Sequence, residues 1–352
     1  MREKLSPSSF IGVEGKDIIS FGSGQPDLPP PREVFEKTRE FREYKYGLIQ
    51  GQKKLREALV EQYPGSTPDS FVITNGASEA IDLTLRALYL NKDIKKKKIL
   101  IPKPYYYSYP ILASNALLEP VFTELNNGRI DIEDFKKKFD QCCAVLINSP
   151  SNPTGRIESI DTLKEIENLS NDNGAYIISD EVYKDLIYER ENYLIEGPKV
   201  ITVNSFSKTF SMCGHRVGYL WARDLDLVDR VIGIKTHSSM NTNINGQEMA
   251  YEATKVPHSF VEHQVKIWKE RRDIIYNGLK SIGLELWKPE GAFYVLPKVD
   301  NAEKVMEDLW YDHKVITYLG DWFGAPGHLR LSYALDKEKI EKGLNIIEQY
   351  LK

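Results

Sequence analysis

The segment from Ser205 to Tyr219 combines a lysine, two hydroxyl residues and an arginine at a spacing that could bind a phosphate group. Ser205 and Ser207 precede Lys208, and Arg216 follows eight residues after the lysine, between two glycines. A lysine amine can form a Schiff base with an aldehyde. Hydroxyls, backbone N–H groups and a guanidinium are suitable ligands for a phosphate dianion. The pattern therefore predicts a lysine that carries a phosphorylated aldehyde, whereas an isolated Ser-Lys pair would indicate a solvated surface lysine.

Two further segments place polar residues directly after apolar runs. The segment 148–155, Asn-Ser-Pro-Ser-Asn-Pro-Thr-Gly, follows the run 144–147 and contains Asn152. Asp180 follows the apolar run 176–179, where a buried carboxylate requires a partner. Taken singly, the first segment could be a plain turn and Asp180 could cap a following helix. Because ligands of open α/β sheets bind beyond the carboxyl ends of the strands, we expect both residues near Lys208.

Together these segments resemble the motifs of the class I/II aminotransferases, the pyridoxal-phosphate-dependent enzymes of fold type I. The resemblance covers nearly the whole chain. It implies that Lys208 holds pyridoxal 5′-phosphate as a Schiff base and moves the α-proton of the substrate, and that Asp180 keeps the cofactor's pyridine nitrogen protonated. It also implies that Asn152 and Tyr183 donate hydrogen bonds to the cofactor's phenolic oxygen. Lys208, Asp180 and Tyr183 are therefore the expected catalytic residues.

The same resemblance implies the residues that bind the rest of the cofactor. The phosphate is expected at the strand-to-helix junction 75–78, because a helix N-terminus and its free N–H groups attract an anion. Tyr106 matches the aromatic residue that stacks on the cofactor ring, although the neighbouring tyrosines 105, 107 and 109 could instead be core residues. The full expected cofactor-binding set is Tyr46, Gly76, Ala77, Ser78, Tyr106, Asn152, Asp180, Tyr183, Ser205, Ser207, Lys208 and Arg216.

Tyr46 also carries an expectation about assembly. It begins the segment 46–51, Tyr-Gly-Leu-Ile-Gln-Gly, and matches the family's tyrosine that reaches the phosphate in the neighbouring subunit. The resemblance, rather than the composition, therefore implies a homodimer in which each active site is built from two chains.

Substrate binding is expected at Gly24, Asn152 and Arg330. Gly24 lies in the segment 22–27, Gly-Ser-Gly-Gln-Pro-Asp, which resembles the family's N-terminal segment near the substrate carboxylate. The segment is not a dinucleotide-binding loop, since Asp27 stands where glycine is required. Arg330 matches the C-terminal arginine that binds the α-carboxylate with two hydrogen bonds. The segment 236–243 contains no arginine to select a dicarboxylate, and the tyrosines of 105–109 favour aromatic or neutral side chains.

The elements that must position these residues are predicted by hydrophobic periodicity. Between residues 70 and 225, short apolar runs alternate with helical patterns such as 78–90 and 160–173. Continuous apolar strands separated by helices predict an α/β fold with a mostly parallel sheet that is covered on both faces. The expected strands are 71–74, 98–101, 144–147, 176–179, 200–203 and 217–220.

The pattern changes after residue 245. Helices are expected at 247–254, 259–282 and 336–351, and short strands around 293–296 and 329–332. A chain of 352 residues also exceeds the usual size of a single core. We therefore expect four regions: an N-terminal segment packed on the small domain (1–44), a large cofactor-binding α/β domain (45–245), a connecting helical segment (246–282) and a small α+β domain (283–352).

The composition argues against several other classes of protein. Lysine and arginine total 47 against 51 acidic residues, and this net charge of −4 gives no support for a nucleic-acid partner. The three cysteines and six histidines form no metal-binding or disulfide motif, so no metal is expected. There is no apolar run of 18 residues and no signal-peptide pattern, which predicts a cytoplasmic protein without a membrane partner.

The expected activity is that of an aminotransferase, which moves an amino group from an L-amino acid to a 2-oxo acid, with 2-oxoglutarate as the expected acceptor. The short N-terminal segment resembles that of histidinol-phosphate aminotransferases, while the segments 180–183 and 331–333 are closer to the aspartate and aromatic group. Two alternatives remain open. One is a pyridoxal-phosphate-dependent lyase or decarboxylase of the same fold, since fold does not determine reaction. The other is a non-catalytic cofactor-binding sensor, although this chain has no spare segment for the DNA-binding module of such regulators.

Overall fold

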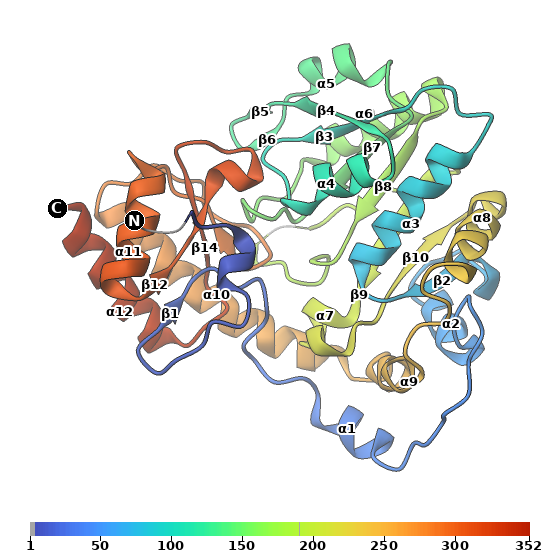
Figure 1. The fold of residues 1–352 in the computed structure, drawn as a ribbon, viewed down its shortest axis with the longest axis horizontal. Helices are drawn as coiled ribbons and strands as arrows, with labels where there is room; N and C mark the ends of the chain where they lie inside the picture. Colours follow the sequence, from blue (N-terminus) through green and yellow to red (C-terminus); the bar gives the residue numbers. More distant parts are fainter. Residues whose placement is uncertain (1–3, 190) are drawn as a thin grey trace.

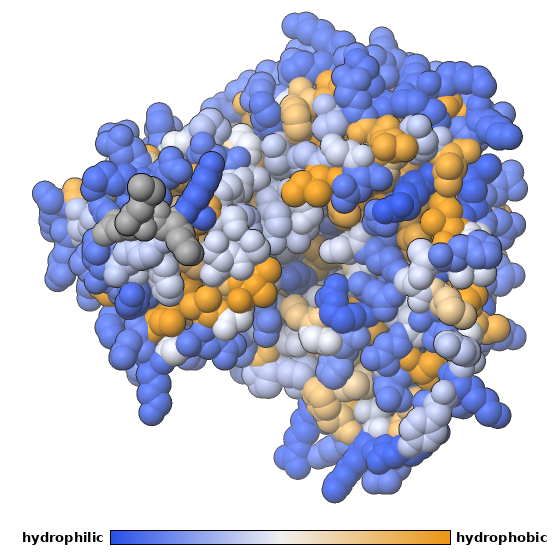
Figure 2. Space-filling view, viewed as in Figure 1, coloured by the Kyte–Doolittle hydropathy of each residue, from blue (hydrophilic) through white to orange (hydrophobic). Residues whose placement is uncertain are grey.

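The computed structural model describes residues 4–189 and 191–352, arranged as a large α/β part and a smaller part (Figure 1). The strand β1 (Ile19–Ser20) and the C-terminal helix α12 (Lys337–Leu351) both lie in the smaller part, whereas α1 (Arg32–Thr38) lies near α9 (Ile244–Ala253). On the face seen in this view, the surface is hollowed between the two parts (Figure 2). No helix in the described ranges has the length and apolar character needed to cross a bilayer. No group of three His, Cys, Asp or Glu side chains among the described residues is arranged to hold a metal ion.

The large part is built on a sheet that has seven strands within the described residues. All strands run parallel except β10, which is antiparallel to both of its neighbours. Parallel strands end at the same edge of a sheet, so the segments that follow β7, β8 and β9 begin side by side. The order across the sheet is β2 (Phe71–Thr74), β10 (Gly218–Ala222), β9 (Val200–Ser205), β8 (Tyr176–Asp180), β7 (Ala144–Asn148), β3 (Lys98–Pro102) and β4 (Glu119–Thr123).

Helices cover both faces of this sheet because neighbouring residues of each strand point to opposite sides. Leu146 packs in the cluster that contains α3 (Ala77–Leu90), α4 (Ser108–Asn115) and α8 (Leu225–Thr236). Val145, one residue earlier, packs on the opposite face with α5 (Ile132–Phe139) and α6 (Ile160–Asn173). At the other end of that face, Phe71 and Ile73 pack with α2 (Lys53–Val60) and α9 (Ile244–Ala253). The strands are therefore apolar on both sides, which explains their continuous apolar runs.

The smaller part joins segments from both ends of the chain. β11 (Tyr294–Val295), β14 (Leu329–Ser332) and β13 (Tyr318–Leu319) form an antiparallel sheet. β1 (Ile19–Ser20) pairs in parallel with β12 (Val315–Ile316), so the N-terminal segment is bound to the C-terminal region. The long helix α10 (His258–Ser281) packs against α12 (Lys337–Leu351), and α11 (Ala302–His313) precedes β12. Trp268 of α10 is fully buried in the shared core.

The remaining elements are short. The helix α1 (Arg32–Thr38) contacts α9, and α7 (Phe206–Thr209) follows β9 directly. A two-stranded ribbon is formed by β5 (Leu125–Asn126) and β6 (Arg129–Ile130). The 3₁₀ helices are η1 (Pro7–Phe10), η2 (Pro68–Ser70), η3 (Cys213–His215) and η4 (Gly320–Phe323).

The α/β fold with a mostly parallel sheet is confirmed, and each of the six expected strands overlaps an observed one. The edge strand β4 was not expected from the sequence. It is only partly buried and contains Pro120, which has no N–H group to donate and which is tolerated at a sheet edge. The division into four regions remains a prediction. The pairing of β1 with β12 is compatible with it, whereas α1 of the N-terminal region lies against α9.

Candidate active site

The carboxyl ends of β7, β8 and β9 bring together the three main residues singled out in the sequence. These strands end at Asn148, Asp180 and Ser205, and they are consecutive neighbours in the sheet. Lys208 lies in α7 directly after β9, and its amine is close enough to Asp180 for the carboxylate to influence the amine's pKa. The spatial convergence expected from the strand order is therefore present.

Lys208 is held at the junction of the large part and the N-terminal segment. Its Nζ donates a hydrogen bond to the carbonyl oxygen of Gly24 at 2.5 Å, and it lies 5.9 Å from the ring centres of both Tyr183 and Phe293. Burial lowers the pKa of Lys208, and the positive charges of Arg330 and Arg216 lower it further, against the opposing effect of Asp180. A lowered pKa increases the fraction of neutral amine, which is the form that attacks an aldehyde.

Asp180 is 5% exposed and has one strong polar partner in the protein. The hydroxyl of Tyr109 donates to Asp180 Oδ2 at 2.6 Å, and the N–H of Val182 donates to Oδ1 at 3.3 Å. Burial raises the pKa of Asp180 to about 6, although both hydrogen bonds and the charge of Lys208 act in the opposite direction. A cation bound beside this carboxylate would restore its charged form. The site is therefore suited to a protonated ring nitrogen.

Tyr109 is a site residue whose role the sequence analysis missed, since it was considered only as a core residue. It is 2% exposed and lies in the first turn of α4, three positions after Tyr106, which precedes the helix. The two rings are 5.4 Å apart in an edge-to-face arrangement. This i, i+3 spacing was the signal that could have identified it.

Gly76, Ala77 and Arg216 form a compact anion-binding arrangement. Gly76 caps α3 with φ 80°, and Ala77 begins the helix. A methyl group at Gly76 would lie 2.5 Å from Arg216 Nη2, so glycine lets the guanidinium approach the helix end. Arg216 donates to the carbonyl oxygens of Asn75 at 3.1 Å and Cys213 at 3.0 Å, and Ser78 is exposed one residue into the helix. A helix N-terminus beside a guanidinium is suited to a phosphate.

The hydroxyl groups of the two serines before the lysine form hydrogen bonds within the protein. The Ser205 hydroxyl accepts the N–H of Ser207 at 3.1 Å and donates to the carbonyl oxygen of Val217 at 2.9 Å. It also lies 2.8 Å from the hydroxyl of Ser207, and both residues are buried. Ser205 therefore caps the short helix that carries Lys208, and contact of either hydroxyl with a phosphate remains a prediction.

Arg330 is a buried cation surrounded by aromatic rings. It is 2% exposed on β14, and its guanidinium carbon lies 4.6 Å from the ring centres of Tyr294 and Tyr318 and 4.7 Å from that of Phe323. Nη1 donates to Asn152 Oδ1 at 3.2 Å, Nη2 donates to the carbonyl oxygen of Gly22, and the buried Nε has no hydrogen-bond partner among the described residues. No carboxylate of the described chain pairs with Arg330, so a ligand carboxylate would complete its environment.

Three expected residues occupy less direct positions. The hydroxyl of Tyr183 is 2.8 Å from that of Tyr294, so the two phenols form a pair. Tyr106 packs against the ring of Tyr107 at 4.7 Å. Tyr46 is 84% exposed on the segment between α1 and α2. Tyr183 therefore lies beside Lys208 and Tyr106 beside Tyr109, the partner of Asp180, whereas Tyr46 faces solvent.

This arrangement fits a phosphorylated aldehyde with a ring nitrogen. Lys208 supplies the amine, Asp180 the carboxylate for the ring, and the junction of Gly76 with Arg216 the anion site. Arg330 supplies a second, separate cationic site with an unused donor. Two separate cationic sites near a reactive amine are what a phosphorylated cofactor and a carboxylate substrate require together.

Comparison with known proteins gives consistent results. Residues 16–347 match the family described as aminotransferase class I and II. A probable aspartate aminotransferase of Methanocaldococcus jannaschii is 35% identical, with 99% of this chain and 98% of the relative covered. Aromatic-amino-acid aminotransferase 2 of Thermococcus litoralis is 31% identical, with 97% and 93% covered. The crystal structure of an aspartate aminotransferase from Thermotoga maritima superimposes with a TM-score of 0.90 at 33% identity, covering 98% of this chain and 94% of that one.

Proposed function

Because this chain belongs to the class I and II aminotransferases, we propose that it moves the amino group of L-aspartate or an aromatic L-amino acid to 2-oxoglutarate. The observation that carries the proposal is Arg330, a buried guanidinium with an unused Nε and no carboxylate partner in the described chain. The hydrogen bond from Arg330 to Asn152 holds the guanidinium near the carboxyl ends of the strands, where Lys208 also lies. A bidentate contact with the α-carboxylate would orient an amino acid toward the lysine.

The cofactor is pyridoxal 5′-phosphate. When bound, it accepts the electrons released at the substrate's α-carbon and carries the amino group between the two half-reactions. Lys208 would hold it covalently and, once released, move a proton at the α-carbon. Gly76, Ala77 and Arg216 would bind its phosphate, together with Ser78 and the serines 205 and 207.

Asp180 would hold the proton on the ring nitrogen of the cofactor. At about 4 Å and an effective dielectric constant near 20, such a pair is worth roughly 4 kcal/mol. Such a pair would favour the charged carboxylate, against the burial that raises the pKa of Asp180. Asn152 and Tyr183 would donate hydrogen bonds to the phenolic oxygen, and Tyr106 would stack on the ring. The hydroxyl of Tyr109, which donates to Asp180, would keep the carboxylate oriented.

The choice of substrate side chain rests on two observations. The relatives described above are named for aspartate and aromatic substrates, which narrows the three substrate types expected from the sequence to two. The rings of Tyr294, Tyr318 and Phe323 surround Arg330, and Tyr107 contacts Phe323 at 5.6 Å. This aromatic lining favours an aromatic donor, and the names of most of the relatives favour aspartate.

We also propose that the enzyme is a homodimer with shared active sites. Tyr46 is 84% exposed, and the exposed side chains of Tyr44 and Leu48 lie beside it in the sequence. Gly47 lies against Ile244 of α9, which places this segment next to residues 240–243. A second copy of the chain covering these apolar side chains would bring Tyr46 to its neighbour's phosphate site.

The substrate proposal is tested with a panel of amino donors and 2-oxoglutarate. The purified enzyme is mixed with each donor alone, and the single-turnover absorbance change of the cofactor is recorded. L-aspartate or an aromatic amino acid should give the fastest single-turnover change, and the highest kcat/KM once 2-oxoglutarate is added. Borohydride treatment should label one peptide at Lys208. A label on another lysine, or turnover that does not need a 2-oxo acid, would overturn the proposal.

A further inference from the structure

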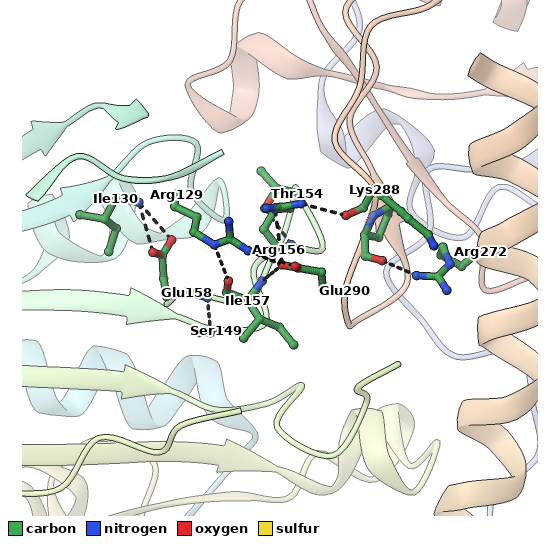
Figure 3. A network of polar contacts seen from close by, with 11 residues as sticks. Arg129, Ile130, Ser149, Thr154, Arg156, Ile157, Glu158, Arg272, Lys288 and Glu290 are labelled. Carbon is green, nitrogen blue, oxygen red and sulfur yellow. Dashed lines mark hydrogen bonds and ion pairs between the residues drawn. The ribbon is translucent and has the colours of Figure 1, made fainter. Parts of the chain in front are cut away.

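A charged cluster joins the loop that carries Asn152 to the smaller part of the molecule (Figure 3). We call it the Glu290 cluster; it consists of Arg129, Arg156, Glu158 and Glu290. Glu290 lies between α10 and β11, in the segment 288–292, whereas Arg156 and Glu158 lie in the loop 149–158 between β7 and α6. Arg129 belongs to β6. None of these residues is among the expected catalytic or binding residues.

The backbone of Glu290 and its carboxylate bind the same loop. Its N–H donates to the carbonyl oxygen of Gly155 at 2.7 Å, and the N–H of Gly291 donates to the same oxygen at 2.9 Å. The carboxylate Oε2 accepts the N–H of Ile157 at 3.1 Å. Gly155 has φ 66°, and a methyl group there would lie 2.7 Å from Pro289 Cβ. The loop and the segment 288–292 are therefore in direct contact along their backbones.

Electrostatics strengthens this junction. Arg129 Nη2 donates to both oxygens of Glu290, at 3.0 and 3.1 Å, and Arg156 Nε lies 3.4 Å from Oε2. The side chains are only 25%, 15% and 13% exposed for Arg129, Arg156 and Glu290 respectively. Ion pairs at this level of burial are screened much less than surface pairs. Removing the Glu290 carboxylate would therefore take a counter-charge away from two largely buried guanidinium groups.

The two chain regions that Glu290 joins each lead to a residue in contact with Arg330. Within the loop, Asn152 accepts a hydrogen bond from Arg330 Nη1 at 3.2 Å. Four residues after Glu290, the ring of Tyr294 lies 4.6 Å from the guanidinium carbon of Arg330. Lys208, Gly76 and Arg216, which we expect to hold the aldehyde and the phosphate of the cofactor, belong to neither segment. A change at Glu290 should therefore disturb the carboxylate site more than the cofactor site.

We propose that Glu290 is a positioning residue for substrate binding. Its carboxylate fixes the loop 149–158 against the segment 288–292. This contact holds Asn152 at hydrogen-bond distance from Arg330 and the ring of Tyr294 over the guanidinium. The proposal rests on the proposed role of Arg330 in binding the α-carboxylate.

The test uses the holoenzyme with Glu290→Gln, which preserves the size of the side chain and removes its charge. The donor is the better of L-aspartate and L-phenylalanine, with 2-oxoglutarate as acceptor. We expect the KM of the donor to rise about tenfold, with a smaller change in kcat, because misorientation weakens the carboxylate contact. The dissociation constant of the cofactor should stay within about twofold, because Lys208, Gly76 and Arg216 belong to neither of the two segments that Glu290 joins.

Glu252→Gln is the matched control. The carboxylate of Glu252 also has two cationic partners, Lys37 and Lys255, and is 11% exposed, but it lies on α9. This variant should leave the KM of the donor unchanged. If Glu290→Gln unfolds, Arg129→Gln provides the second measurement, since Arg156 remains as a partner for Glu290, and it should shift KM in the same direction by a smaller factor.

Three outcomes decide the proposal. A rise in KM with retained cofactor affinity, absent in Glu252→Gln, supports it. An unchanged KM in both Glu290→Gln and Arg129→Gln overturns it, and so does an equal loss of cofactor and substrate affinity. Arg330→Lys, measured alongside, separates this inference from the proposed function. If Arg330→Lys leaves the KM of the donor unchanged, the role of Arg330 fails and the positioning role of Glu290 fails with it.

Discussion

Burial shifts the two central ionisable residues in opposite directions from their ordinary behaviour. The pKa of Asp180 is raised and the pKa of Lys208 is lowered, because the site disfavours charge on either residue when it stands alone. The folded chain alone therefore does not fully stabilise the charged form of either residue. An aldehyde with a protonated ring nitrogen meets both needs, since it removes the amine's positive charge and supplies a cation to the carboxylate.

Replacing Asp180 by asparagine should slow the removal of the α-proton far more than it weakens cofactor binding. Asparagine keeps the size and an acceptor for Tyr109 but loses the charge that stabilises the ring proton, worth roughly 4 kcal/mol or about a thousandfold in rate. Single-turnover absorbance measures this step directly. Tyr109→Phe is the control, because it removes one hydrogen bond to the carboxylate and should cost only about fivefold. A single-turnover rate of Asp180→Asn within tenfold of the wild type would refute the role of Asp180.

Arg330→Lys should not preserve function, because an ammonium group cannot offer two parallel N–H donors. We expect kcat/KM to fall by a factor that corresponds to a loss of about 2–3 kcal/mol of transition-state stabilisation, with an unchanged cofactor spectrum. Arg56→Lys is the control, since Arg56 is 5% exposed and donates to the carbonyl oxygens of Gly51 and Pro68. It should affect thermal stability but not kcat/KM. An Arg330→Lys enzyme with normal kinetics toward amino acids would show that another group binds the carboxylate.

At the level of elements, the sequence predicts the strands better than the contacts between them. The runs that became β7, β8 and β9 are apolar throughout because both of their faces are covered, and the convergence of Asn152, Asp180 and Lys208 follows from their parallel order. The contact between Glu290 and Gly155 joins residues 135 positions apart, and no local pattern encodes it. The hydrogen bond between Tyr183 and Tyr294 likewise joins residues far apart in the sequence, and no local pattern encodes it.

The start of α3 offers a test of the anion site. Gly76→Ala would introduce a methyl group 2.5 Å from Arg216 Nη2, at a φ of 80°. The guanidinium must then move away, so the dissociation constant of the cofactor should rise by about tenfold or more. Gly174→Ala is the matched control: it shares a positive φ of 64°, but a methyl group there meets nothing within 4 Å. It should cost about 1 kcal/mol of stability and leave cofactor affinity unchanged. Equal cofactor affinity in the two variants would contradict the assignment.

Glu158 joins the loop 149–158 to β6 and should make stability depend on pH. Both of its oxygens accept the N–H of Ile130, at 3.1 and 3.2 Å. Burial raises the pKa of Glu158 to about 7, with a further contribution from Glu290, while the Ile130 N–H, Arg129 and Arg156 oppose the shift. The folded protein therefore binds this proton more tightly than the unfolded chain does. The resulting stabilisation is complete below the unfolded pKa near 4.5 and is lost as pH rises to about 7.

Glu158→Gln, which resembles the protonated form, should therefore gain stability relative to the wild type as pH rises. Between about pH 5 and about pH 8, the difference in free energy of unfolding should change by on the order of 2 kcal/mol, as measured by urea unfolding. Glu196→Gln, an exposed carboxylate paired with Arg223, should show no such trend. A difference between wild type and Glu158→Gln that does not vary with pH would disprove the shift.

At the level of the whole molecule, the site exists only where distant parts meet. Lys208 and Asp180 come from the large part, Arg330 from the smaller part, and Gly22 and Gly24 from the N-terminal segment. The proposed dimer adds a fourth contributor, Tyr46 of a second copy.

Mixed dimers can test that contribution. A Lys208→Ala chain and a Tyr46→Phe chain should each have low activity when pure. If Tyr46 acts across the interface, each mixed dimer has one site with both an intact lysine and an intact tyrosine. Because about half of the dimers in an equal mixture are mixed, activity should recover toward about a quarter of the normal value. If Tyr46 acts within its own chain, no site in the mixture is intact and activity stays low. Sedimentation of the unmixed enzyme checks that it is a dimer.

The pairing of β1 with β12 also limits how early the N-terminal segment can reach its final position during synthesis. Ile19 leaves the ribosome early, but its partner Val315 is made about 300 residues later. At the usual elongation rates of protein synthesis this separation corresponds to roughly 15–60 s. During that interval the segment that will present Gly22 and Gly24 has no strand to join. The nascent chain can form its central sheet first, whereas the contacts of Gly22 with Arg330 and of Gly24 with Lys208 must wait until translation is nearly complete.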